Sequence, residues 1–393
     1  MRNRKPTLLT AIAVVTIFLY SCTKSGNINQ PETMSNPNLG LHNYGLMAMD
    51  PSQWSDVPVF NSNALLARGD GAAPVANMPS SYLLSSPAIR DQGQIGSCTG
   101  FCGTESNEIL RYYYANSFPV SSTDLTVATG LSTATQTQNV NSTLFGSSSA
   151  LSPLFLYYVE RCVILKQSIT ADNGAYMVNI PQTLQGLSSN SGSGTALSLK
   201  INRKTYTFKG ECYENLYSYP SNGSHNSTQY RTAPSATAIS NAPNFYIGVQ
   251  SGTTGSSGTT THGYYVINSS DVVTDAKTAI ANHLPVMMGF NVYDNSQYLY
   301  FEGLGIQGYA PNNFTYNPLT SSGTLVSGLK LLGGHAVPLI GYIDDSSQPG
   351  GGVFICQNSW STSWGYHGYF YLPYSVLRST KIVPAGNLYV GII

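Results

Sequence analysis

The amino-acid sequence predicts an α+β protein with two lobes, a helical lobe followed by an antiparallel, barrel-like β lobe. The chain has 393 residues, which is enough for one large domain or two lobes. Residues 97–115 lack proline and carry apolar and aromatic side chains at helical spacing. Beyond Gly210 the pattern changes to short aromatic and β-branched segments separated by turns. The change of pattern places the helical lobe at about residues 97–209 and the β lobe at about residues 210–393.

The first 22 residues have the pattern of a bacterial lipoprotein signal peptide. Arg2, Arg4 and Lys5 are followed by a largely apolar stretch at residues 8–20. This stretch is too short for a membrane span, which needs about 20 residues. The sequence LYSC at residues 19–22 resembles a lipobox, which predicts lipidation of Cys22 after cleavage. The alternative is an ordinary signal peptide with an unrelated cysteine.

Residues 23–76 are predicted to be a flexible tether or a short pro-segment. They are rich in Asn, Ser, Pro and Gly and have little apolar periodicity. No long amphipathic helix is evident, so a passive spacer is the favoured interpretation, and an inhibitory role stays open. The remaining residues, 77–393, form the predicted folded domain.

The helical lobe is predicted to begin with a helix over residues 97–115. Ser97 is a candidate N-cap, and Phe101, Glu105, Glu108 and Tyr112 follow at helical spacing. A second helix is predicted over residues 154–166. The low-complexity insertion at 188–208 is expected to be a surface loop.

The β lobe is predicted from several short segments with strand composition. They are GYYVINS, PVMMGFNVYD, HAVPLIGYI, GVFICQNS and GYFYLP, in that order along the chain. The Gly/Ser/Thr-rich insertion at 251–263 and the long connection at 298–330 are expected to lie on the surface.

Composition excludes several classes of function. Lys and Arg together number 18, as do Asp and Glu, and only 9% of residues are charged. Such a chain offers no basic surface for nucleic acid. No CxxC pair, HExxH motif or EF-hand loop is present, so we expect neither a catalytic metal nor a cofactor.

The six cysteines have different predicted roles. Cys22 is the lipidation candidate, and Cys98 is treated below. Cys356 lies in an apolar strand and is predicted to be a buried free thiol, and Cys102 is predicted to face the core. Cys162 and Cys212 are candidates for a disulfide in an exported protein, although sequence does not fix the pairing of the four structural cysteines.

Three separated motifs carry the chemistry. RDQGQIGSCTGF places Cys98 after a glycine-containing turn, at the start of the first predicted helix, where the helix dipole favours a thiolate. Gln92 stands upstream as an amide donor for an oxyanion. LLGGHAVPLIGY contains His335, and FICQNSWSTSWG contains Asn358. A nucleophilic cysteine, a histidine base and an amide that orients the imidazole are the parts of a thiol-dependent acyl-transfer site.

In order and local context these motifs resemble the papain family of cysteine peptidases from about residue 77 to the C-terminus. The resemblance implies a two-lobe fold with the active site in the cleft between the lobes. It implies that Cys98 is the nucleophile, His335 the general base and acid, and Asn358 the residue that orients the ring. Gln92 and the Cys98 N–H would form the oxyanion hole, and Trp360 would cover the His–Asn contact. Gly333 and Gly334 would allow close backbone approach before the histidine.

The chain departs from the family pattern at several positions. Ile95 stands where many members have a disulfide cysteine, Thr99 where they have tryptophan, and Ser361 where they have glycine. His335 lies 237 residues after Cys98, against about 130–150 expected. Insertions between the motifs explain this spacing. They affect the assignment of the substrate subsites more than that of the catalytic residues.

The sequence therefore predicts an exported cell-envelope lipoprotein, periplasmic or on the cell surface, that hydrolyses peptide bonds. We expect a monomer acting on peptide or protein substrates and held to a membrane by its lipid. One alternative is a binding protein that keeps the fold without catalysis, and another is a related acyl-transfer enzyme. Substrate preference, endo- or exopeptidase action and the membrane face are not specified by the sequence.

Overall fold

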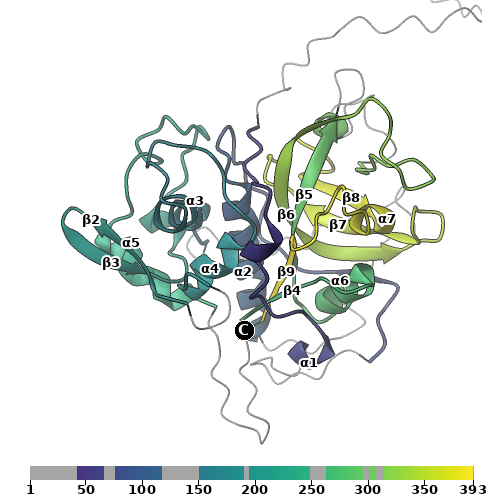
Figure 1. The fold of residues 1–393 in the computed structure, drawn as a ribbon, viewed down its shortest axis with the longest axis horizontal. Helices are drawn as coiled ribbons and strands as arrows, with labels where there is room; N and C mark the ends of the chain where they lie inside the picture. The colour runs from purple at the N-terminus through teal and green to yellow at the C-terminus, as the bar shows by residue number, and fades with distance from the viewer. Residues whose placement is uncertain are drawn as a thin grey trace, which may run out of the picture. The chain divides into compact units, whose positions relative to one another are not determined.

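The computed structural model describes residues 42–65, 76–116, 150–189, 194–247, 263–294, 301–305 and 314–392 (Figure 1). The predicted signal peptide, Cys22 and most of the 251–263 insertion lie outside these ranges. Within them, helices and a small hairpin gather on one side of helix α2 (Cys98–Asn116), and a large sheet lies on the other. The α+β prediction is confirmed.

The helical lobe is built around the predicted helices. Helix α2 matches the prediction for residues 97–115 closely. Helix α3 (Pro153–Tyr158) starts at Pro153, and the Ser152 side chain caps it by accepting the Phe155 N–H. The remaining helical and hairpin elements of this lobe are α4 (Asn179–Gln185), α5 (Ala236–Asn241), η3 (Glu214–Leu216), η4 (Ala242–Phe245), β2 (Leu197–Ile201) and β3 (Lys204–Phe208).

The predicted helix at 154–166 changes character halfway. Its second half is a π-helix, η2 (Val159–Ile164), and the Leu165 N–H donates to the Glu160 carbonyl. This wider turn carries the buried Arg161, whose guanidinium lies 4.2 Å from the Tyr230 ring centroid and donates to the Ala171 carbonyl. Insertion of a charged residue into the lobe interior thus accompanies the irregular helix.

The insertion at 188–208 is more ordered than the sequence suggests. Leu197 to Ile201 pair with Lys204 to Phe208 as an antiparallel hairpin, and Phe208 is fully buried. The expectation of a surface loop is therefore wrong for β2 and β3. The low-complexity composition hid the alternation that places Leu197 and Phe208 on the inner face.

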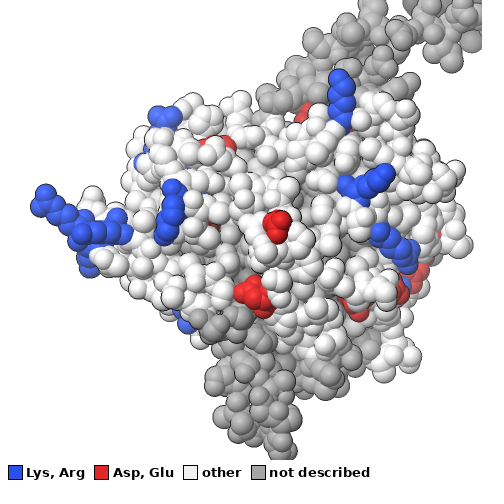
Figure 2. Space-filling model, in the orientation of Figure 1, with Lys and Arg blue, Asp and Glu red and all other residues white. Residues whose placement is uncertain are grey.

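Figure 2 shows that the face in view is largely uncharged, with basic side chains at the periphery over this hairpin. Lys200, Arg203 and Lys204 of the hairpin are exposed.

The β lobe is one antiparallel sheet in the order β4-β9-β5-β6-β7-β8, with β1 paired to β6. All five predicted strand segments contribute to it. The strands are β1 (Ser81–Leu83), β4 (Tyr264–Val266), β5 (Val286–Asp294), β6 (Lys330–Asp344), β7 (Gly352–Gln357), β8 (Tyr369–Pro373) and β9 (Leu388–Gly391). The associated helices are η1 (Pro51–Gln53), α1 (Ser62–Leu65), α6 (Val272–Ala281), η5 (Glu302–Gly305) and α7 (Tyr374–Leu377).

Two hydrophobic cores stabilise the described chain. The larger one joins the sheet to the face of α2 that carries Cys102, Ile109 and Leu110. The second packs α3 and η2 against residues between Leu197 and Ala242. Residues 211–242 therefore pack in the helical lobe, although the sequence placed the start of the β lobe at about residue 210.

The described cysteines are all buried free thiols: Cys98, Cys102, Cys162, Cys212 and Cys356. The predictions for Cys102 and Cys356 are confirmed, since both side chains are fully buried. Cys162 and Cys212 do not form the candidate disulfide in this structure.

The N-terminal segment at residues 42–65 packs onto the domain. Val57, Phe60 and Leu65 are buried in the larger core, and the Phe60 N–H donates to the Val266 carbonyl beside β4. These residues belong to the range predicted as tether or pro-segment. No helix in the described part of the chain is long and apolar enough to cross a membrane.

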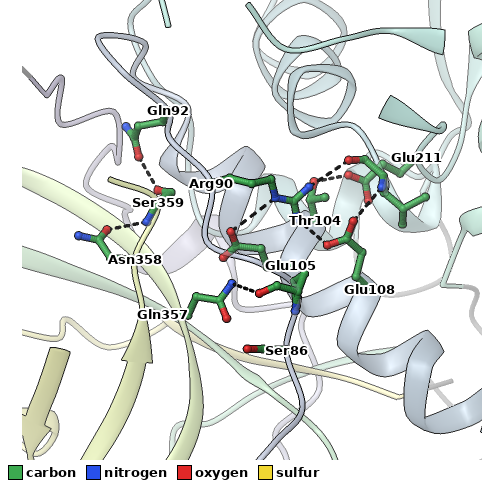
Figure 3. A network of polar contacts seen from close by, with 12 residues as sticks. Ser86, Arg90, Gln92, Thr104, Glu105, Glu108, Glu211, Gln357, Asn358 and Ser359 are labelled. Carbon is green, nitrogen blue, oxygen red and sulfur yellow. Dashed lines mark hydrogen bonds and ion pairs between the residues drawn. The ribbon is translucent and has the colours of Figure 1, made fainter. Parts of the chain in front are cut away.

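Helix α2 carries buried carboxyl groups that face Arg90 and the helical lobe (Figure 3). Arg90 is ion-paired with Glu108 at 2.5 Å and lies 3.9 Å from Glu105. Glu211 accepts hydrogen bonds from Thr104 and Asn107. Burial raises the pKa values of Glu105 and Glu211 to about 8. Both carboxyl groups are therefore largely protonated in the folded protein at neutral pH.

These raised pKa values predict that the unfolding free energy falls as the pH rises from about 5 to 8. Each group keeps its proton in the folded state but loses it near pH 4.5 in the unfolded chain. The stabilisation is thus complete below pH 4.5 and is lost as the pH approaches the folded pKa. Urea unfolding at pH 5 and pH 8 measures the slope, which Glu211→Gln should flatten because an amide does not titrate. An unchanged slope in that variant would contradict the assignment.

Candidate active site

Cys98 begins helix α2 and is fully buried. The turn before it is closed by the Ile95 N–H, which donates to the Gln92 carbonyl. The backbone N–H groups of Ala336, Gly45 and Thr99 lie near enough to the Cys98 thiol to lower its pKa, against the larger effect of burial. Since Ala336 follows His335 directly, the sulfur lies beside the histidine segment of strand β6.

His335 lies on β6, opposite Phe290 of β5, and is fully buried. Its Nε2 atom is 2.8 Å from Asn358 Oδ1. Its Nδ1 atom has no hydrogen-bond partner among the described residues, which leaves this nitrogen available for a thiol. The Trp360 ring lies over the pair, with its centroid 4.8 Å from that of His335. An amide oxygen on Nε2 favours the tautomer with its proton there, without adding negative charge.

Gln92 comes from the turn before α2 and is fully buried. Its Oε1 accepts a hydrogen bond from Ser359 Oγ at 2.7 Å, and the Ser359 N–H donates to Asn358 Oδ1 at 2.9 Å (Figure 3). Its Nε2 donates to the Ile95 carbonyl at 2.9 Å and toward the Asn43 carbonyl at 3.4 Å. Ser359 thus fixes the orientation of the Gln92 amide, whose Nε2 donates to backbone carbonyls of Ile95 and of Asn43 in the segment before the domain. The sequence motif contained this serine but gave no sign of the role.

Residues 42–47 lie across this site. The Leu46 N–H donates to the Gly334 carbonyl, the Met47 N–H to the Ala175 carbonyl, and the Ala175 N–H to the Gly45 carbonyl. Segment 42–47 therefore bridges the β lobe and the helical lobe by backbone hydrogen bonds.

Glycines allow segment 42–47 to come this close. A Cβ atom at Gly334 would lie 2.7 Å from the Leu46 carbonyl oxygen, and one at Gly45 would lie 1.7 Å from the Gly96 carbonyl oxygen. The close approach expected at Gly334 is thus made here by the chain's own N-terminal segment.

The side chains of segment 42–47 cover the catalytic candidates. The His42 ring stacks on Trp360 with centroids 4.1 Å apart, and the Tyr44 ring stands edge-on to both His335 and Trp360. This cover accounts in part for the full burial of Cys98 and His335.

Burial also sets the protonation of the covered site. It raises the pKa of the Cys98 thiol to about 12 and lowers the pKa of the His335 imidazole to about 4. Both groups are then neutral at pH 7. The ion pair that makes a thiol nucleophilic is absent while segment 42–47 is in place.

The structure thus brings together Gln92, Cys98, His335, Asn358 and Trp360, which the sequence had singled out in three motifs. Cys22, the lipidation candidate, lies outside the described residues. Sequence reasoning missed Ser359, Tyr44 and Glu302. Their signal is tertiary, because Tyr44 and Glu302 are 258 residues apart and meet only in the fold.

Part of the chain matches a known protein family in sequence. Residues 209–383 match the model of the papain family cysteine proteases. The matched region contains His335 and Asn358 but begins after Cys98. An "uncharacterized peptidase C1-like protein" of Acanthamoeba polyphaga mimivirus is 25% identical over 115 residues, which is 28% of this chain. The matched stretch covers 30% of that relative's length.

The fold is similar to that of a solved enzyme. The crystal structure of xylellain, a cysteine protease from Xylella fastidiosa, aligns with a TM-score of 0.55 and 19% identity. The alignment covers 90% of this chain and 96% of xylellain. At this identity the likeness shows the fold alone. The chain therefore has a papain-like fold, and its residues 209–383 match the papain family in sequence.

Proposed function

We propose that the protein is a cysteine peptidase that uses Cys98, His335 and Asn358 with Gln92 as an oxyanion donor. The observation that carries the proposal is the His335–Asn358 hydrogen bond, with the free His335 Nδ1 on the strand that contacts the Cys98 sulfur. The papain-family sequence of residues 209–383 supports the same reaction.

In the proposed reaction the Cys98 thiolate attacks the scissile carbonyl carbon. The Gln92 Nε2–H and the Cys98 backbone N–H bind the oxyanion that forms. His335 protonates the leaving amine, which leaves a thioester on Cys98. The same imidazole then takes a proton from water, and the resulting attack releases the acid product. Asn358 holds the ring tautomer throughout, and Ser359 holds the Gln92 amide in the donating orientation.

We propose further that residues 42–47 act as a pro-segment that keeps the enzyme latent. The segment binds both sides of the site through Gly334 and Ala175, and it desolvates the thiol and imidazole.

The earlier part of the chain is assigned by its sequence. We propose export, lipidation of Cys22 and anchoring of a monomeric enzyme in the cell envelope, with residues 23–41 between the lipid and segment 42–47. Metabolic labelling with a fatty-acid analogue, in cells producing the chain or its Cys22→Ser variant, tests the anchor. Equal lipid incorporation in the two proteins would contradict it.

A thiol-directed covalent probe tests the proposed function. The full chain carrying Gly45→Ala is used, because a Cβ at Gly45 would lie 1.7 Å from the Gly96 carbonyl oxygen and displace segment 42–47. Its incubation with a peptidyl epoxide is expected to modify a single residue, Cys98, and to stop peptide hydrolysis in proportion to labelling. Mass spectrometry of the digested protein locates the modified residue. Hydrolysis that persists after complete labelling of Cys98 would exclude the peptidase mechanism. Labelling without hydrolysis of any peptide pool would favour a binding protein, and amide formation with an added amine would favour acyl transfer.

A further inference from the structure

The Tyr44 side chain reaches a buried carboxyl group, that of Glu302. The Tyr44 hydroxyl donates a hydrogen bond to Glu302 Oε1 at 2.5 Å. Glu302 is the first residue of η5 and is only 7% exposed. Burial and the neighbouring Glu302 carboxylate both raise the pKa of Tyr44, so the phenol remains a donor. The contact is therefore a charge-assisted hydrogen bond in a largely dry setting.

The backbone that carries Glu302 is anchored to the end of β5. The backbone N–H groups of Phe301 and Glu302 both donate to Asp294 at the end of β5. The Phe301 side chain is fully buried, with its ring centroid 5.1 Å from that of Trp360 and 5.8 Å from that of His335. Glu302 is thus fixed relative to the catalytic imidazole.

Tyr44 and Glu302 lie on the His335 side of the site. Tyr44 stands edge-on to His335 and Trp360, whereas Leu46 lies between Gly334 and Ala175. In the proposed reaction His335 protonates the amine that leaves, so the residue supplying that amine must sit beside the imidazole. A substrate that displaces segment 42–47 brings the side chain of this residue to the position of Tyr44.

We propose that Glu302 is a specificity-determining residue that selects a long side chain with a terminal hydrogen-bond donor, arginine or lysine above all, immediately after the scissile bond. The proposal rests on the proposed peptidase function. Arginine and lysine are about as long as tyrosine, and their charge adds an ionic component to the bond that Tyr44 makes. A phenylalanine at this position would leave the Glu302 carboxylate without that donor, and a glutamate would repel it.

Hydrolysis of matched peptides tests the selection. The peptides differ only in the residue after the scissile bond, which is arginine, lysine, tyrosine, phenylalanine or glutamate, and mass spectrometry confirms the cut. The enzyme is the full chain carrying Gly45→Ala, which should open the cleft because the new Cβ would clash with the Gly96 carbonyl oxygen. We expect kcat/KM for the arginine peptide to exceed that for phenylalanine by about 10- to 100-fold. Glu302→Gln should reduce this ratio to within about threefold, and Asp345→Asn, in the β6–β7 turn, should keep it.

A second measurement uses the chain's own segment as the ligand and needs no turnover. In the full chain, Tyr44→Phe should speed thiol labelling of Cys98 and Tyr44→Arg should slow it, because Glu302 holds segment 42–47 less or more firmly. Glu302→Gln should remove the difference between the two variants, as a double-mutant cycle measures.

The outcomes separate the two hypotheses. Two outcomes would overturn the role of Glu302 while leaving the peptidase function intact. One is an arginine preference in hydrolysis that persists in Glu302→Gln, and the other is a labelling rate that does not depend on the residue at position 44. Failure of every peptide to be hydrolysed through Cys98 would overturn the proposed function and the subsite with it.

Discussion

Cys98→Ala is expected to reduce peptide hydrolysis by at least about 10⁴-fold, because alanine removes the thiol on which the proposed thioester forms. The sulfur is the atom that contacts the Ala336 N–H beside His335, and alanine offers no replacement nucleophile. Water delivered by His335 alone lacks the covalent step that divides a difficult reaction into two easier ones. Initial rates with a fluorogenic peptide, in the chain opened by Gly45→Ala, provide the measurement.

Cys102→Ala is the matched control for this loss. Cys102 lies one turn further along α2 and is also a fully buried free thiol, but it faces the hydrophobic core. Its removal is expected to change stability slightly and to leave labelling at Cys98 intact. Comparable activity in the Gly45→Ala chain with and without Cys98→Ala would refute the mechanism.

Gly45→Ala is expected to raise the rate of thiol labelling at Cys98 by about 100-fold or more in the full chain. The new Cβ would lie 1.7 Å from the Gly96 carbonyl oxygen, and the Gly45 carbonyl itself lies against Gly174. Backbone on both sides leaves no flexible atom to yield, and overpacking of this kind costs about 3 kcal/mol. Each 1.4 kcal/mol changes the ratio of open to closed molecules about tenfold, so segment 42–47 should leave the cleft about 100-fold more often than in the wild-type chain.

Opening the cleft should also change the pH dependence of labelling. While segment 42–47 is bound, burial keeps the pKa of Cys98 at about 12 and that of His335 at about 4, so labelling requires transient opening. Solvent access lowers the first pKa and raises the second, which favours the thiolate–imidazolium pair at neutral pH. Gly351→Ala is the control, since it strains the β6–β7 turn at a φ of +96° while no atom lies within 4 Å of the new Cβ. Equal labelling of the Gly45→Ala and Gly351→Ala chains would show that segment 42–47 does not inhibit.

Much of the fold followed from the sequence because its signals are local. The helix at Cys98 and the five strand segments are defined by residue spacing within a few turns, and their positions agree with the prediction. The π-helical turn at Val159 and the hairpin at Leu197 were missed. Both depend on side chains buried against distant residues, such as Arg161 against Tyr230, which local composition does not report.

The candidate catalytic residues could be selected from the sequence for a similar reason. A cysteine after a tight turn, a histidine after paired glycines and an asparagine before a tryptophan are short motifs, and their chemistry is specific to acyl transfer. The sequence alone therefore determined the catalytic set, the order of the lobes and the family resemblance.

Only the tertiary structure decided how the site is controlled. Residues 42–47 have the composition of a spacer, yet they fill the space between Ala175 and Gly334 and bring Tyr44 to Glu302. They are held by backbone hydrogen bonds, and their close approach depends on the absence of side chains at Gly45 and at the facing Gly96, Gly174 and Gly334. Backbone hydrogen bonds leave no pattern in the sequence. The partners of segment 42–47 therefore become visible only in the folded chain, together with the burial that favours the neutral forms of Cys98 and His335.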